Sequence, residues 1–137
     1  MGTWDFGPFD NDTAADWSGE LNDAEPGRRV ELIREALTAA ANEDEYLDSD
    51  YACEAIAAAA VVASQLPGGP AITTSYGPDF LVQGGTIDLP DDLPELALQA
   101  LARVAGEDSE WRDLWEDSFG KALRALEPIR AALEEAL

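Results

Sequence analysis

Apolar residues recur at intervals of three and four positions along most of the chain, the spacing that places them on one face of an α-helix. In the first half of the chain this spacing predicts three helices, over about residues 11–23, 27–41 and 50–65. The third differs from the others because it consists almost entirely of alanine, valine and isoleucine. A helix that is apolar on nearly every side belongs at the centre of a bundle.

Polar residues precede two of these helices and are their expected N-caps. A carboxylate or hydroxyl oxygen at such a position can accept a hydrogen bond from a backbone N–H that has no partner within the helix. Asp10 is the expected cap of the first helix, and Ser49 or Asp50 is the expected cap of the third.

The second half of the chain predicts two more helices, over about residues 93–105 and 109–135. Gly106 ends the first of them, since glycine commonly terminates a helix. Apolar residues continue through the second without a gap, which predicts one long helix that bends at Pro128, where an internal hydrogen bond is lost. The stripe comprises Trp111, Trp115, Phe119, Ala122, Leu126, Ile129 and Leu133.

Glycine and proline concentrate in an irregular insertion at residues 67–92. Within it, residues 72–76 and 80–83 could pair as a small β-hairpin, and a long loop lying over the bundle is the alternative. The predicted fold is therefore all-α: a single domain over residues 1–137, built as a bundle of about five helices with this insertion between the third and the fourth.

Aromatic residues crowd the N-terminus, although free chain ends are normally polar. We expect residues 1–10 to form a clasp that folds back onto the bundle. The alternative is that some of these rings stay exposed as anchors for a partner, since aromatic residues dominate interface hot spots. In the clasp, the expected contacts are those of Trp4, Phe9 and Trp17 with Trp111, Trp115 or Phe119.

The formal net charge is −21, from 29 acidic and 8 basic residues. Such a charge repels phosphate backbones and anionic lipid surfaces, which argues against direct nucleic-acid binding and against binding to a membrane. The longest apolar run is too short to span a bilayer, and no signal peptide is visible. We therefore expect a cytoplasmic protein.

Histidine is absent and Cys53 is the only cysteine. These counts exclude Ser–His–Asp and Cys–His catalysis, a disulfide within the chain and the ordinary zinc sites. The glycine pairs lack the spacing of nucleotide-binding loops. We therefore expect neither enzyme activity nor a bound cofactor or metal.

Acidic residues dominate a long stretch without lysine or arginine, residues 35–102. A solvated face that reflects compositional bias is one interpretation. The other is a surface for a basic protein partner, because complementary charge speeds encounter and aids specificity. The candidate contacts are Glu43, Asp44, Glu45, Asp48, Asp50 and Glu54.

The partner interpretation predicts a non-catalytic binding protein, in the manner of an immunity protein or a nuclease inhibitor. Two other classes stay open at this stage. One is a small-molecule or divalent-metal-dependent protein that uses residues 70–92 as a lid, and the other is a plain oligomeric scaffold. The sequence does not determine the oligomeric state.

Several short blocks of the sequence carry a family resemblance. They are Met-Gly-Thr-Trp (1–4), Gly-Pro-Phe (7–9), Asn-Asp-Thr-Ala (11–14), Asp-Trp (16–17), Glu-Tyr-Leu-Asp (45–48), the alanine-rich helix (57–63) and Asp-Leu-Trp-Glu (113–116). Together they resemble the DUF4259 family, bacterial proteins of uncharacterised function. The resemblance covers most of the chain and implies a compact cytosolic protein, without indicating a reaction.

Overall fold

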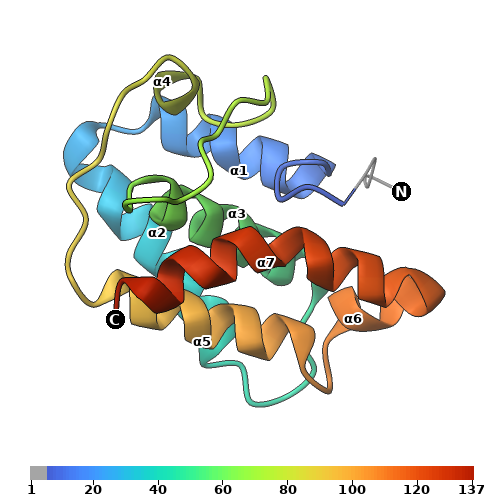
Figure 1. Ribbon diagram of the computed structural model, residues 1–137. Helices are drawn as coiled ribbons and strands as arrows, with labels where there is room; N and C mark the ends of the chain where they lie inside the picture. The colour runs from blue at the N-terminus through green and yellow to red at the C-terminus, as the bar shows by residue number, and fades with distance from the viewer. Residues whose placement is uncertain (1–5) are drawn as a thin grey trace.

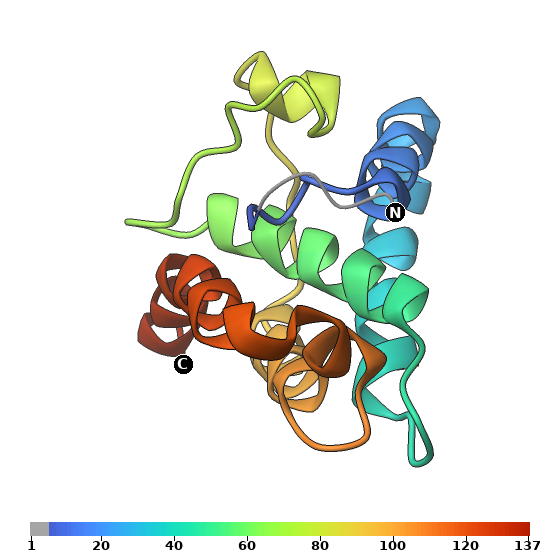
Figure 2. The ribbon, with the colours of Figure 1, turned by 90° about the vertical axis from the view of Figure 1, so that its right-hand side faces the viewer.

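One apolar helix lies at the centre of the structure, a computed structural model that describes residues 6–137. This helix, α3 (Ser49–Ser64), buries an unbroken run of side chains from Ala55 to Ala63. Figure 2 shows α3 crossing the middle of the molecule, with the first two helices on one side and the last ones below it. The sequence prediction of a central, fully apolar helix is confirmed.

Six further α-helices and one 3₁₀ helix accompany α3 in the described part of the chain (Figure 1). The order is α1 (Asp12–Asp23), α2 (Pro26–Ala41), α3, α4 (Asp79–Val82), α5 (Leu93–Ala105), α6 (Glu110–Trp115), η1 (Glu116–Ser118) and α7 (Phe119–Glu135). Residues 6–137 contain no β-strand, so the predicted all-α class is confirmed.

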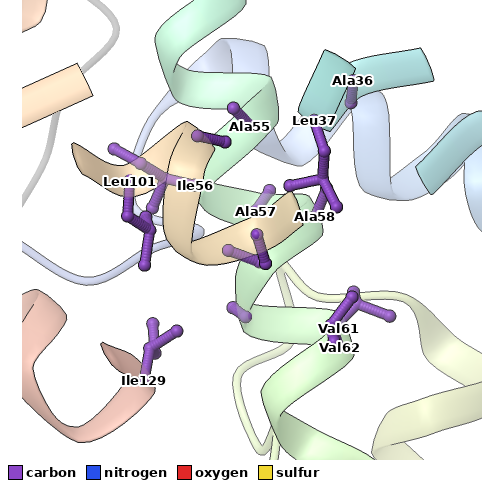
Figure 3. Close-up of a cluster of buried hydrophobic side chains, with 14 of the residues drawn as sticks. Ala36, Leu37, Ala55, Ile56, Ala57, Ala58, Val61, Val62, Leu101 and Ile129 are labelled. Carbon is purple, nitrogen blue, oxygen red and sulfur yellow. The ribbon is translucent and has the colours of Figure 1, made fainter. Parts of the chain in front are cut away.

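Small side chains allow the neighbouring helices to approach α3 closely. Ala57, Ala58 and Ala59 are fully buried. Larger side chains from the surrounding helices cover them, and Figure 3 shows Leu37 of α2 and Leu101 of α5 beside the alanines. Alanine also has the highest helix propensity, so one residue type serves both local structure and packing.

Both predicted N-caps are wrong by one or two residues. The side chain of Asn11 caps α1 by accepting a hydrogen bond of 2.7 Å from the N–H of Ala14. Asp10 instead closes the preceding turn, where its carboxylate accepts from the N–H of Gly7 at 3.0 Å. Asp48 caps α3 by accepting from the N–H of Asp50 at 2.8 Å, so Ser49 is already helical.

In the described part of the expected clasp, Phe6 makes a contact that was not predicted. Phe6 stacks on Trp115, with ring centroids 4.7 Å apart. Phe9 and Trp17 are buried, which rules them out as exposed anchors, but neither takes part in a ring pair among the described residues. Trp4 lies outside the described residues.

The insertion forms no β-hairpin. Residues 80–82, expected in its second strand, belong to the short helix α4. This helix docks at the corner between α1 and α2, where the guanidinium of Arg29 lies 3.7 Å from the centre of the Phe80 ring. The backbone N–H of Phe80 donates to the side-chain oxygen of Asn22 at 2.9 Å. These contacts favour one helical turn over an extended strand.

The predicted long C-terminal helix is interrupted. It consists of α6 and α7, which are joined by η1, and Pro128 lies within α7. The interruption occurs at Glu116, whose φ of 48° is left-handed. Trp111 meets Trp115 within α6 and Phe119 across the break, both edge-on and each with ring centroids 6.1 Å apart. The unbroken apolar spacing could not reveal this change of direction.

We predict that Glu116→Gly stabilises the protein. A residue with a Cβ is strained at positive φ, and glycine removes that strain, so the free energy of unfolding should rise by about 1 kcal/mol. Glu116→Gln is the control, because it removes the charge but keeps the Cβ, and it should change little. Chemical denaturation measures both variants. A glycine variant less stable than the parent would show that the left-handed conformation is not strained.

Candidate functional site

The loop between α2 and α3 pairs with the loop between α5 and α6 at one end of the bundle. The backbone N–H of Leu47 donates to the carbonyl of Asp108 at 2.8 Å, and the N–H of Glu110 donates to the carbonyl of Leu47 at 2.9 Å. These bonds form an isolated parallel bridge between Leu47 and Ser109, both fully buried. The two loops lie at the bottom of Figure 1. Their pairing fixes one backbone against the other.

Arg103, near the end of α5, ties the same loops together. Its Nε donates to the carbonyl of Glu43 at 2.9 Å, and one Nη also donates to the carbonyl of Glu45. Its other Nη donates to the carbonyls of Glu107 and Asp108, at 3.0 and 3.2 Å. The guanidinium therefore donates to four backbone oxygens, two from each loop.

The pairing gathers carboxylates that are distant in the sequence. They come from the first loop, from the cap of α3, from the second loop and from α6. The exposed ring of Tyr46 lies among them. We call this set the acidic loop surface: Glu43, Asp44, Glu45, Tyr46, Asp48, Asp108 and Asp113.

The structure divides the six residues predicted from the sequence into two groups. Four belong to the acidic loop surface: Glu43, Asp44, Glu45 and Asp48. The other two, Asp50 and Glu54, lie on the side of α3 that faces α1. There the hydroxyl of Thr13 donates to Asp50 at 3.0 Å. Burial, followed by the charges of Glu20 and Asp50, raises the pKa of the half-buried Glu54.

Asp108 and Asp113 were not among the candidate contacts predicted from the sequence. They lie in an acidic run at residues 107–113, but nothing in that run indicates that it meets the first loop. The connection depends on tertiary contacts such as the bond from the N–H of Ser49 to Glu110, which joins residues 61 positions apart. The one local signal is the concentration of acids on both sides of Ser109.

Tyr46 links the two halves of the acidic loop surface. Its hydroxyl donates to the carboxylate of Asp113 at 2.8 Å. This hydrogen bond, with smaller contributions from burial and from the charges of Asp113, Glu110 and Asp108, raises the pKa of Tyr46 to about 12. The phenol therefore stays neutral and acts as a donor at physiological pH.

Ion pairs between described residues use acids elsewhere in the molecule. Arginine side chains on α2 and α7 hold them, and no pair includes a carboxylate of the acidic loop surface. The pairs are Arg28–Glu31, Arg28–Glu35, Arg34–Asp92, Arg130–Glu127 and Arg130–Glu134.

Other kinds of site find little support in residues 6–137. No three His, Cys, Asp or Glu side chains in this range gather closely enough to hold a metal ion. Within the same range, no helix is long and apolar enough to cross a membrane.

Comparison with known proteins identifies the family. Residues 2–134 match the model of a family described as a domain of unknown function, DUF4259. The chain belongs to the DUF4259 family. No curated protein and no solved structure matches the chain. Family membership confirms the resemblance noted in the sequence, and it assigns no activity to DUF4259 proteins.

We predict a late tyrosine titration that belongs to Tyr46. Its pKa is raised from 10.0 to about 12 in the folded protein. The neutral phenol therefore stabilises the fold fully below pH 10, and this contribution is lost as the pH rises from about 10 to 12. Ultraviolet absorbance of the phenolate follows the step while circular dichroism monitors folding.

The late step should disappear in Tyr46→Phe and persist in Tyr51→Phe, which removes another exposed tyrosine. A late step that survives in Tyr46→Phe would contradict the hydrogen bond to Asp113.

Proposed function

We propose that this DUF4259 protein is a non-catalytic cytoplasmic binding protein whose acidic loop surface meets a basic protein partner, in the manner of an immunity protein or an inhibitor. One observation carries the proposal. Carboxylates from two separate loops stand together on a fixed backbone, and none of them is paired with a basic side chain among the described residues.

Mutual repulsion is the electrostatic consequence of this arrangement. Like charges placed close together destabilise the free protein, and the net charge of −21 adds to the effect. A cationic partner relieves the repulsion and gains complementary charge at the same time. Both electrostatic gains arise only in the complex, as expected for a surface whose role is to bind a partner.

Exposed tyrosines support a partner rich in arginine or lysine. Tyr46 and Tyr51 expose 52% and 54% of their surface. Tyrosine is enriched at binding hot spots, and its ring face attracts guanidinium and ammonium groups. The ring of Tyr46 lies beside several carboxylates, so a basic side chain could contact the ring face and a carboxylate together.

Preorganisation further favours binding. The bonds of Leu47 and Arg103 hold the loop backbones before any partner arrives. Less conformational entropy is then lost on association, which increases affinity.

A small-molecule function with the insertion as a lid is the second candidate. Residues 70–74 form one wall of a cavity of about 260 Å³, which Phe9 and Ile129 also line. This function would be insensitive to charge changes on the acidic loop surface, since the cavity lies beside α7.

Charge-neutralising variants separate these functions. The loop variant combines Glu43→Gln, Asp44→Asn and Glu45→Gln. The control variant combines Asp88→Asn, Asp91→Asn and Glu95→Gln, three exposed acids without a hydrogen-bond or ion-pair partner among the described residues. Both variants change the net charge equally. Each is used with the parent protein to capture partners from a lysate of the source cells.

We predict that the parent and the control variant retain a basic protein, and that the loop variant binds it at least about tenfold more weakly. Raising the salt concentration from roughly 0.05 to 0.5 M should release it, since exposed charges are strongly screened over that range. A neutral partner, equal binding by the two variants, or binding insensitive to salt would contradict the proposal.

A further inference from the structure

A cavity of about 490 Å³ opens where the N-terminal ends of α1 and α3 approach α6. Residues 6–8 form part of its wall, and it is separate from the acidic loop surface, apart from the neighbouring cap of α3. Its volume falls within the range of small-molecule sites in proteins. Nothing described so far uses it.

Aromatic rings form the apolar part of the wall. Trp111 and Trp115 meet edge-on, and Phe6 stacks on Trp115, so the three rings hold one another in place. Ile56 of α3 and Leu126 of α7 extend the same wall. Such a wall suits the hydrocarbon body of a ligand, and its ring faces attract a positive charge.

Carboxylates supply the polar part of the wall. Asp12 and Asp50 both line the cavity. The hydroxyl of Thr13 donates to one oxygen of Asp50, and Asp12 has no hydrogen-bond or ion-pair partner in residues 6–137. No lysine or arginine lines the cavity. The polar end therefore carries negative charge that no lysine or arginine among residues 6–137 balances.

The helix ends do not reverse this preference. A free helix N-terminus attracts anions, but three N–H groups at these two ends already have acceptors within the chain. Asn11 accepts from the N–H of Ala14, and Asp48 accepts from the N–H of Asp50. Glu110 accepts from the N–H of Ser49 at 2.9 Å. An anionic ligand would also meet the carboxylates of Asp12 and Asp50.

Cys53 also lines the cavity. Burial, followed by the charges of Asp50, Glu54 and Asp48, raises the pKa of this thiol to about 12. Of these causes, the carboxylate charges also favour an ammonium, whereas burial disfavours any charged group. The raised pKa also makes Cys53 a poor nucleophile, which argues for binding over covalent chemistry.

We propose that this cavity binds a small organic cation, with a primary ammonium group between Asp12 and Asp50 and an apolar body against Trp111 and Trp115. The combination of two carboxylates with an aromatic wall selects this class over neutral and anionic molecules of the same shape. The proposal is independent of the partner surface, because it uses different side chains and a different ligand.

Three probes of matched shape test it on the full-length protein: phenethylammonium, 2-phenylethanol and phenylacetate. Calorimetry at about physiological salt should show saturable 1:1 binding of phenethylammonium, with the alcohol and the acid at least about tenfold weaker. Equal binding of all three would show a merely apolar cavity and overturn the proposal. Absence of binding at millimolar phenethylammonium would overturn it as well.

Single-residue variants distinguish binding of the cation in the cavity from its general attraction to a negatively charged protein. Asp12→Asn and Asp50→Asn should each weaken phenethylammonium binding by about tenfold, since each removes one charge from the polar end. Asp23→Asn removes the same charge from the opposite end of α1 and should change binding little. Equal losses in all three variants would overturn the proposal. The comparison of the three probes decides the question even where a variant folds poorly.

Discussion

The close approach of helices to α3 is the constraint on which the rest of the structure depends. Ala57, Ala58 and Ala59 leave room for neighbouring backbones on several sides, so α2 and α5 both pack directly against the central helix. Larger residues at these positions would force the neighbours apart, because protein interiors are close-packed and tolerate little added volume. The relative positions of the surrounding helices therefore follow from the small side chains of one element.

The acidic loop surface is a consequence of that packing. Because α2 and α5 both lie against α3, the loops that follow them meet at one end of the bundle. Hydrogen bonds made by Leu47 and Arg103 then join these two otherwise separate loops. Acids that would repel one another in a mobile loop are held together at fixed positions. Stability of the core and the proposed function are linked through these few bonds.

The sequence predicted what depends on local spacing. The helices around residues 11–23, 27–41, 50–65 and 93–105 follow from apolar periodicity, and the structure places them within one or two positions of those bounds. The sequence could not predict the break at Glu116, because the apolar stripe continues through residue 116. The left-handed conformation of Glu116 leaves no signal in the composition. Four of the six candidate residues fall on one surface, whereas Asp108 and Asp113 join it only through tertiary pairing. Contacts between distant segments are the part that periodicity does not encode.

Amide hydrogen exchange at Leu47 and Glu110 is the most direct test of whether the two loops form one fixed surface. Lysine has a single nitrogen and cannot reach four carbonyls, so Arg103→Lys should loosen both loops. The account predicts that these two amides exchange about tenfold faster in Arg103→Lys, with no change in Arg124→Lys, which alters an exposed arginine on α7. Unchanged protection in Arg103→Lys would show that Arg103 does not hold the loops together and would contradict the account.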